Sequence, residues 1–318
     1  MKTNPAILAI CISACALHAQ SIPSNPGDPL PGLPVEAVQL FQSGRAEFTK
    51  TRFGGFTTCS GCHISSAIGG ADYTFDPNSG RRSSTPLFGA GLIENIPDEA
   101  ILALERRPEA LALGIGGRAA RVVDSSSGRL RVGRFGWKAQ HAGLLDAAAD
   151  NLSRFMGIPE TVSRNEAPDP VTGLRAIDRL AAFSRLLAPI SPIPPSPAAD
   201  TGSNIFNTIG CAVCHTRTIT TAPAGTLNPA SISPFSDFLL HDIGTGDGVA
   251  QGAAFPNDIR TAPLWGLRLR KMYLHDGSAL TLPDAIRVHK GESSIVRQRF
   301  DALKETDRQA LIEFLKTL

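Results

Sequence analysis

The stretches CSGCH, at residues 59–63, and CAVCH, at residues 211–215, repeat one spacing of cysteine and histidine and decide how the chain is interpreted. C-x-x-C-H is the attachment signature of c-type haem, because both thiols add across the porphyrin vinyl groups and the adjacent histidine becomes the proximal iron ligand. The sequence therefore predicts two covalently bound haem c groups. Their predicted attachment and ligand residues are Cys59, Cys62, His63, Cys211, Cys214 and His215.

Three other uses of paired cysteines fit this pattern less well. A redox dithiol of the thioredoxin type would lie in a βαβ pattern, which neither region shows. Zinc needs four converging ligands, whereas the two pairs lie far apart in the chain and each has its own histidine. Structural disulfides are the usual interpretation of four cysteines in an exported chain, but they do not require a histidine after each pair.

Length and charge limit the classes of function. The chain has 318 residues, which is long enough for two domains with separate cores. Its 31 Lys+Arg and 29 Asp+Glu residues give a formal net charge of +2. Nucleic-acid binding normally requires a strongly basic surface, so the composition argues against nucleic acid as a partner.

The N-terminus has the composition of a secretory signal. A lysine at position 2 precedes a short apolar run and a small residue, Ala19. The run is too short to span a bilayer, so we expect residues 1–19 to be a cleaved signal peptide and the mature chain to have no transmembrane span. An alternative processing would leave a lipid anchor on Cys15. Residues 20–37 are rich in proline and are predicted to be a tether, and the protein is predicted to be periplasmic or otherwise exported.

The remaining sequence predicts a mostly α fold: two tandem cytochrome c-like haem domains with long irregular loops. Helical periodicity indicates helices at 34–48, 98–107, 143–157, 173–188 and 306–318. A hairpin is expected only within residues 123–137, around a Ser-Gly turn.

The segment 188–199 marks the predicted domain boundary. It has five prolines in twelve residues, a composition that we expect to form a connector and neither a helix nor a central strand. We therefore place the N-terminal haem domain at 38–195 and the C-terminal haem domain at 196–318.

Few side chains are available as the second axial ligand of each iron. The histidines outside the signal segment and the two motifs are His141, His241, His275 and His289, and the methionines beyond the initiator are Met156 and Met272. By itself, His289 would be interpreted as a solvated histidine at a helix end, beside Arg287 and Lys290.

Four further segments make the chain recognisable: PLFGAGLIENIPDEAIL (86–102), RFGWKAQ (134–140), PFSDFLLHDIG (234–244) and RTAPLWGLRLRKMYLHDGSALTLPDAIRVHKGES (260–293). Together with both haem motifs, they resemble the di-haem oxidoreductases often labelled thiol oxidoreductases. That group is related to bacterial di-haem cytochrome c peroxidases, to the enzyme that matures methylamine dehydrogenase and, more distantly, to haem rubber oxygenases. The similarity extends from about residue 38 to the C-terminus. It is specific for the superfamily and says little about the reaction.

The resemblance implies different roles for the two haem groups. In the related peroxidases the sixth ligand of the C-terminal haem, usually a methionine, lies fourteen residues after the histidine of an HDG tripeptide. Here His275 belongs to HDG and the ligand position holds His289, which would face His215 across a low-spin relay haem. His275 would instead hold a propionate or a backbone group. Trp137 matches the tryptophan that carries an electron between the haems, and the haem at His63 would be high-spin and reactive.

One position departs from the peroxidase relatives. They place a glutamate, the acid/base for O–O cleavage, just before the methionine of the segment matching NLSRFMGIPE, and this chain has Phe155 there. A phenylalanine cannot move a proton, so the usual route of peroxide cleavage is not expected. Arg154 could polarise a bound peroxide and Asp150 or His141 could serve as the base, although each resembles a surface residue. His241 is expected to be structural.

The expected function is that of an exported, peroxidase-like di-haem c-type oxidoreductase. Electrons would pass from a donor protein or small reductant through the relay haem and Trp137 to peroxide or dioxygen at the His63 haem. Two alternatives remain: a non-enzymatic electron-transfer cytochrome with both irons six-coordinate, and a dioxygen-activating oxygenase of the rubber-cleaving kind. Peroxidase relatives hold calcium through carbonyl groups just before HDG, but the local sequence LRKMYL differs and gives calcium no support.

Overall fold

The structure is a computed structural model that describes residues 25–50, 58–64, 66–71, 73–76, 80–221 and 230–318. Helices dominate this part of the chain: α1 (Val35–Thr49), α2 (Cys59–Cys62), α3 (Ala90–Glu94), α4 (Asp98–Leu104), α5 (Pro108–Leu111), α6 (Leu144–Met156), α7 (Glu160–Arg164), α8 (Ala176–Leu186), α9 (Pro197–Ile209), α10 (Leu282–Arg287), α11 (Ser294–Asp301) and α12 (Glu305–Leu315). The strands are short and pair two by two in antiparallel order: β1 (Tyr73–Asp76) with β2 (Gly80–Ser83), β3 (Arg121–Val123) with β4 (Leu130–Val132), β5 (Ile219–Thr220) with β6 (Ser231–Ile232), and β7 (Leu240–His241) with β8 (Ile259–Arg260).

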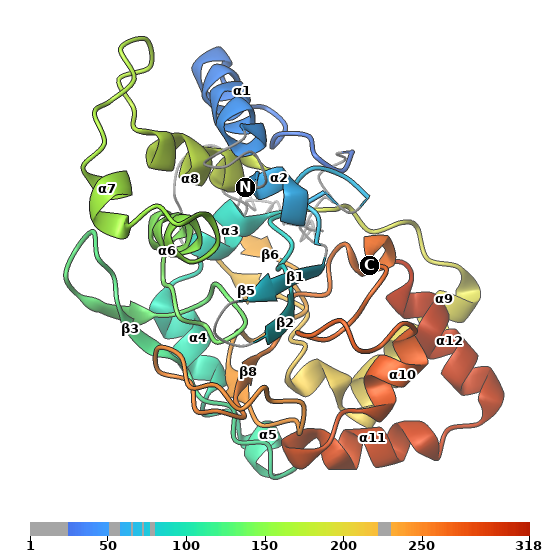
Figure 1. The fold of residues 1–318 in the computed structure, drawn as a ribbon. Coiled ribbons are helices and arrows are strands. Elements are labelled where there is room, and N and C mark those ends of the chain that lie inside the picture. Colours follow the sequence, from blue (N-terminus) through green and yellow to red (C-terminus); the bar gives the residue numbers. More distant parts are fainter. Residues whose placement is uncertain (1–24, 51–57, 65, 72, 77–79, 222–229) are drawn as a thin grey trace, which may run out of the picture.

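Two helix pairs form the main cores. Helix α1 packs along α8, with α6 beside them at one end of the molecule, and α9 packs along α12 at the other end (Figure 1). Each pair crosses at a glycine. A Cβ on Gly44 would lie 2.3 Å from the carbonyl oxygen of Arg179, and a Cβ on Gly202 would lie 1.9 Å from that of Ala310. A side chain at either crossing would push the two helices apart.

Each of these glycines is followed one helical turn later by a phenylalanine that reaches the nearby motif histidine. The ring centre of Phe48 lies 5.9 Å from that of His63, and the ring centre of Phe206 lies 6.4 Å from that of His215. Both phenylalanines are almost completely buried. The two halves therefore build the same helix-pair arrangement around each motif, and the fold is helix-rich as predicted.

The predicted helices and hairpin are present with small shifts at their ends. Helices α1, α4, α6, α8 and α12 correspond to the five predicted ranges, and β3–β4 is the predicted hairpin. The apolar face expected for α8 is buried, with Ile177 and Leu180 packed in the core beside α1 and α6. Helical periodicity was a sufficient guide for α1, α6, α8 and α12 because each of these helices buries apolar residues at helical spacing.

The end of the Pro-rich segment corrects one prediction. Helix α9 begins at Pro197, inside the segment 188–199 that was expected to contain no helix. The hydroxyl of Ser196 caps this helix by accepting a hydrogen bond of 3.2 Å from the backbone N–H of Ala199. Proline is compatible with the first position of a helix because the N–H group that it lacks would have no partner there.

The described part of the predicted tether is packed against the protein. The backbone N–H of Leu30 donates to the carbonyl of Leu186 at 2.8 Å, and that of Ala188 donates to Asp28 at 3.0 Å. The Leu30 side chain is buried in a core cluster, and this apolar contact explains why the segment is held. The predicted signal peptide, residues 1–19, lies outside the described residues.

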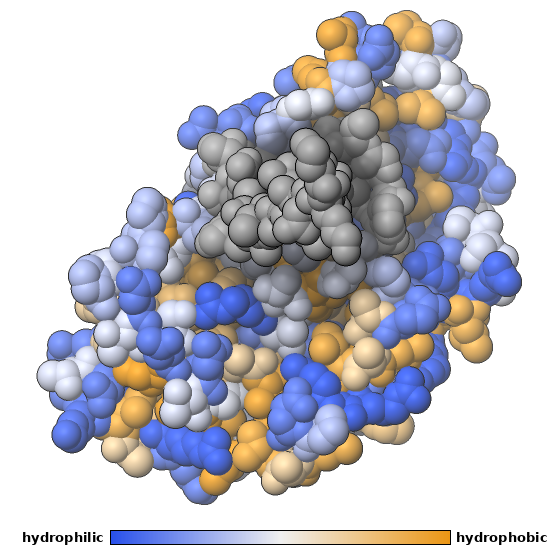
Figure 2. Space-filling view, turned by 180° about the vertical axis from the view of Figure 1, so that it is seen from behind, coloured by the Kyte–Doolittle hydropathy of each residue, from blue (hydrophilic) through white to orange (hydrophobic). Residues whose placement is uncertain are grey.

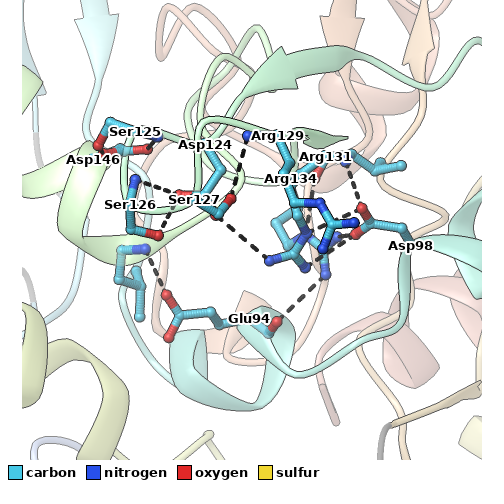
Figure 3. Close-up of polar contacts among 12 residues, drawn as sticks. Glu94, Asp98, Asp124, Ser125, Ser126, Ser127, Arg129, Arg131, Arg134 and Asp146 are labelled. Atoms are coloured by element: carbon cyan, nitrogen blue, oxygen red, sulfur yellow. Dashed lines mark hydrogen bonds and ion pairs between the residues drawn. The ribbon is translucent and has the colours of Figure 1, made fainter.

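A buried arginine anchors the loop that follows β4. The guanidinium group of Arg134 has no exposed surface, and it donates to the carbonyl groups of Ile96 and Val132 and to the carboxylate of Asp98. Figure 3 shows Arg131 and Arg134 converging on Asp98 from the hairpin side. Because a buried guanidinium needs all its partners in place, this network fixes the start of the RFGWKAQ segment.

Segments from both parts of the sequence meet between the helix pairs (Figure 1). Arg118 and Leu240 exchange two backbone hydrogen bonds of 2.9 Å, and the N–H of Arg260 donates to the carbonyl of Trp137 at 2.7 Å. The guanidinium of Arg107 also donates to the carbonyl of Val213, inside the second motif. The division near residue 195 stays a prediction.

The surface has a mixed character. Figure 2 shows hydrophilic residues interspersed with smaller hydrophobic groups on the face opposite to that of Figure 1. One exposed apolar pair is Val123 and Leu130, which face each other across the β3–β4 hairpin. Within the residues that the structure describes, none of the helices combines the length and the apolar character needed to cross a membrane.

Candidate functional site

The first motif opens into a cavity at the end of the α1–α8 pair. Cys59 and Cys62 lie on α2, and His63 caps the C-terminus of this helix. The Nδ1 of His63 lies 3.2 Å from the carbonyl oxygen of Gly70. A carbonyl oxygen can only accept, so Nδ1 carries the hydrogen and Nε2 keeps a lone pair. Burial lowers the pKa of His63 to about 4, and the imidazole is therefore neutral near pH 7 and able to bind a metal.

The second motif opens into a separate cavity near the α9–α12 pair. His215 donates through Nδ1 to the carbonyl of Phe235 at 3.0 Å, and burial lowers its pKa to about 4. His289, two residues beyond α10, lines the same cavity. It donates through Nδ1 to the carbonyl of Ala285 at 2.7 Å, and burial lowers its pKa as well. Both imidazoles are thus neutral, with the lone pair on Nε2.

The motif cysteines do not form the alternative sites considered from the sequence. The structure joins none of the four in a disulfide, and the two pairs line different cavities. Burial raises the pKa of the Cys211 thiol to about 12, whereas a redox or nucleophilic cysteine needs a lowered pKa. Within the described residues, the atoms that approach a metal-binding arrangement belong to Cys214, Asp237 and His241.

His241 occupies a buried charge network beside the second motif. Its Nδ1 lies 2.9 Å from Glu292 and its Nε2 lies 3.2 Å from Asp237. Burial lowers the pKa of His241, but the ion pair with Asp237 and the contact with Cys214 together outweigh burial and raise this pKa well above its usual value. An imidazole held between two carboxylates has no lone pair to offer to iron, which agrees with a structural role.

Trp137 lies between the two cavities and lines both of them. Its indole N–H donates to the carbonyl of Ser83 at 2.6 Å, and its ring lies edge-on to His275 with a centroid distance of 6.3 Å. The neighbouring Lys138 is completely buried and pairs with Asp247 at 2.9 Å. The Trp137 ring is therefore held by the Ser83 carbonyl and the His275 ring, and the Lys138–Asp247 pair anchors the adjacent residue.

Two buried arginines also line both cavities. Burial lowers the pKa of Arg260 and of Arg270 to about 10. Among the described residues, neither guanidinium has a carboxylate within salt-bridge distance, and the Nε of Arg270 is buried without a hydrogen-bond partner. Buried cations of this kind are expected to face an anionic ligand. A haem group, with its two propionates, supplies such a ligand, and the donor set of each cavity fits it.

His275 is buried next to this region. Its side chain lines the second cavity, and its Nδ1 has no hydrogen-bond partner among the described residues. Its backbone carbonyl accepts from the N–H of Ser83 at 2.7 Å. The predicted role of the His275 side chain in holding a propionate or a nearby backbone group remains a prediction, because this contact belongs to the main chain.

Helix α6 forms one wall of the first cavity with Arg154, Phe155 and Met156. The residues considered as substitute bases, His141 and Asp150, line this cavity too. The Nε2 of His141 lies 3.0 Å from an oxygen of Asp150, although the sequence suggested that both were surface residues. Nine positions separate them, and a turn before α6 brings them together, which no periodic pattern indicates.

Sequence reasoning also assigned no role to Arg260 and Arg270, although both lie in the segment that carries the resemblance. The available signal was the presence of three arginines, these two and Arg268, in a mainly apolar stretch, RTAPLWGLRLR, at residues 260–270. Cations in apolar surroundings are rare unless they are paired.

The chain matches a protein family and several solved structures. The profile of the family described as "Di-haem oxidoreductase, putative peroxidase" matches residues 53–173 and 194–318. No curated protein matches the sequence. A structure of hydrazine synthase from Kuenenia stuttgartiensis is 19% identical with a TM-score of 0.52, covering 99% of this chain and 100% of that chain. A MauG-like protein associated with microbial copper homeostasis is 17% identical with a TM-score of 0.52, covering 91% and 92%.

These structural likenesses concern the fold, because the identities are low. The family match covers well over half of the chain and includes both haem motifs. The two cavities, each with its own cysteine pair and neutral histidine, agree with two haem groups. The chain therefore belongs to the di-haem oxidoreductase family and is an oxidoreductase enzyme.

Proposed function

We propose that this chain is an exported c-type di-haem enzyme that reduces peroxide at a haem held by His63. Electrons would reach this haem from a second haem held between His215 and His289. One arrangement carries the proposal: each motif lines its own cavity, and Trp137 lines both. Among the described residues, a second imidazole whose Nε2 makes no hydrogen bond lies only in the second cavity.

The second cavity supports a closed, electron-relaying site. His215 and His289 are both neutral and both present a lone pair on Nε2. Their Nδ1 hydrogens are held by backbone carbonyls, which fixes the ring orientation before any ligand binds. A two-histidine iron generally takes up and releases electrons without binding a substrate.

The first cavity supports a reactive site. When bound there, a haem would supply an iron that binds peroxide and exchanges electrons. Besides His63, the described wall contains one histidine, His141, and one methionine, Met156, whose side chains could bind iron. Nε2 of His141 is engaged by Asp150, and we propose that neither Nδ1 of His141 nor the thioether of Met156 binds this iron, which keeps an open position.

Trp137 supports electron transfer between the sites. Its N–H is bonded to a carbonyl oxygen, which can accept a hydrogen bond but is a poor base. The proton would therefore stay on the indole when an electron leaves. The reductant would be a donor protein or a small molecule, and the haem groups would be attached covalently through the four motif cysteines. The signal-like N-terminus supports export to the periplasm or beyond.

Resting-state EPR and absorption spectra of the holoprotein, with and without added peroxide, test this function. We expect one high-spin and one low-spin haem, and peroxide consumption when a reductant is present. Two low-spin haems and no consumption would identify an electron-transfer cytochrome. Products that form with dioxygen in the absence of peroxide would identify an oxygenase.

A further inference from the structure

We propose that His141, oriented by Asp150, is the group that moves the peroxide proton in the first cavity. This inference rests on the proposed function, because it concerns the haem held by His63. It assigns to a histidine the task that the phenylalanine at position 155 cannot perform.

The pair has a defined polarity. Nε2 of His141 lies 3.0 Å from Oδ2 of Asp150, and an ionised carboxylate only accepts hydrogen bonds. Nε2 therefore carries the hydrogen in the neutral ring, and the lone pair lies on Nδ1. No protein atom of the described residues is hydrogen-bonded to Nδ1. The carboxylate thus selects the tautomer that leaves a base available, as a carboxylate does in other histidine-dependent enzymes.

The backbone of His141 is held firmly. Its carbonyl oxygen accepts from the N–H groups of Arg134 at 2.8 Å and Phe135 at 3.0 Å, and its own N–H donates back to Phe135 at 3.4 Å. These hydrogen bonds lie in the loop that also carries Trp137. The buried Arg134 network fixes the position of this loop. A proton-transfer group must be placed to within a fraction of an ångström, and a rigid backbone serves that need.

The side chains of the pair belong to the cavity wall. His141 and Asp150 both line the first cavity and keep only 16% and 20% of their side-chain surface exposed. Arg154, one helical turn after Asp150, has its NH1 4.0 Å from the same carboxylate oxygen. The guanidinium provides a positive partner for Asp150, but it cannot itself act as a base.

Apart from its partner Asp150 and the motif residue His63, the described wall offers no carboxylate or histidine that could take the place of His141. Phe155 and Met156 carry no exchangeable proton, and the arginines on the wall remain protonated at any working pH. His63 is committed to iron through Nε2 and to Gly70 through Nδ1. The imidazole of His141, with its hydrogen on Nε2 and its lone pair on Nδ1, is the side chain best able to take and return a proton there.

The proton step can be written in full. Nδ1 of His141 accepts the proton from the peroxide oxygen nearer the iron and returns it to the remote oxygen. The O–O bond would then break, the remote oxygen would leave with the bonding pair as water, and the other oxygen would become the second water after taking up two electrons and two protons. One peroxide, two electrons and two protons give two waters in the complete reaction, and the electrons come from the reductant through the second haem and Trp137.

Cyanide and azide binding to the ferric holoprotein tests the proposal without peroxide. Near neutral pH cyanide is mostly the neutral acid and must lose a proton to bind iron, whereas azide is mostly the anion. We expect His141→Gln to slow cyanide association by about 10²–10⁴-fold, the usual contribution of a positioned acid/base group, and to change azide association little. Peroxide consumption should slow by a similar factor, and the resting spin state should not change.

Asp150→Asn is the second variant, because it keeps the shape of the wall. An amide can donate to Nε2, which would move the hydrogen to Nδ1 and remove the base. Its cyanide association should therefore slow towards that of His141→Gln while azide association stays near the normal rate. Asp146→Asn is the matched control. It makes the same change one turn earlier on α6, where the carboxylate pairs with Arg164 and Ser125 outside the first cavity, and both rates should stay normal.

Three outcomes would overturn the proposal. Cyanide could slow no more than azide, which would leave His141 a structural role. The wild-type first haem could be low-spin and become high-spin in His141→Gln, which would make His141 the iron ligand. The first haem could also be closed to both anions by another ligand. If the wild type consumed no peroxide but showed the predicted cyanide pattern, the proposed function would fail and the assignment of His141 as the base would stand.

Discussion

Replacing each of the two tryptophans by phenylalanine separates electron transfer from packing. Trp137 and Trp265 are equally buried, at 7% and 8% exposure, but Trp137 lines both cavities whereas Trp265 lines only the first. Trp137→Phe also removes the donor to the buried Ser83 carbonyl, and an unsatisfied buried acceptor costs about 1–3 kcal/mol. Among the described residues, the Trp265 N–H has no hydrogen-bond partner, so the second variant lacks this cost.

The two variants should therefore differ in stability and in rate. Trp137→Phe should have the lower Tm by roughly 2–10 °C, because about 1 kcal/mol shifts Tm by about 2–4 °C in a chain of this class. Oxidation of the second haem after mixing with one equivalent of peroxide, followed by stopped-flow absorbance, should slow by at least about tenfold in Trp137→Phe, or about 1.4 kcal/mol in the barrier. It should stay near normal in Trp265→Phe. Equal rates in two correctly folded variants would show that Trp137 is only a packing residue.

Four further predictions follow from the two cavities. Denatured protein should retain two haem groups per chain by mass and pyridine haemochrome assay, and extraction of haem by acid acetone would contradict covalent attachment at the C-x-x-C-H motifs. His289→Ala should turn the second haem from low to high spin while His275→Ala leaves it unchanged, and the opposite pattern in EPR would mean that the two histidines are exchanged. Phe155→Glu, introduced into His141→Gln, should recover part of the about 10²–10⁴-fold loss in peroxide consumption; no recovery would show that this position does not face bound peroxide. The ion pair that raises the pKa of His241 stabilises the protein fully below the unfolded pKa of about 6.5 and less as pH rises through the folded pKa. The loss of Tm at alkaline pH should therefore be smaller in His241→Gln, and identical slopes would argue against a charged imidazole.

The parts of the structure that the sequence predicts are those governed by local patterns. Two C-x-x-C-H motifs specify two haem groups regardless of the fold, because one chemical function needs all three side chains together. Four of the five predicted helices, α1, α6, α8 and α12, bury apolar residues at helical spacing, which produces a period that can be counted in the sequence. The hairpin β3–β4 has a Ser-Gly turn with a glycine at positive φ, Gly128, and this too is a local signal.

The parts that were missed depend on long-range contacts. The strands β5 to β8 have two residues each, which is too short for any alternation to show. The packing of Leu30 and the bond between His141 and Asp150 depend on how distant turns place their side chains. Pro197 was misjudged for another reason, because the same residue stops a helix in its interior and starts one at its first position.

The contrast between the two cavities follows from the part of a helix that each one meets. The second cavity meets the C-terminal end of α10, where carbonyl groups lack helical partners. The carbonyl of Ala285 therefore accepts the hydrogen bond from Nδ1 of His289 and sets the orientation of the ring, including that of Nε2. The first cavity meets the flank of α6 at Asp150, in the middle of the helix and not at its end. There a side chain, the Asp150 carboxylate, orients His141. Under the proposed function, orientation by a carbonyl would give a neutral ligand for iron, whereas orientation by a carboxylate would give a base. Two halves with the same helix-pair frame would then hold a relay site and a reactive site.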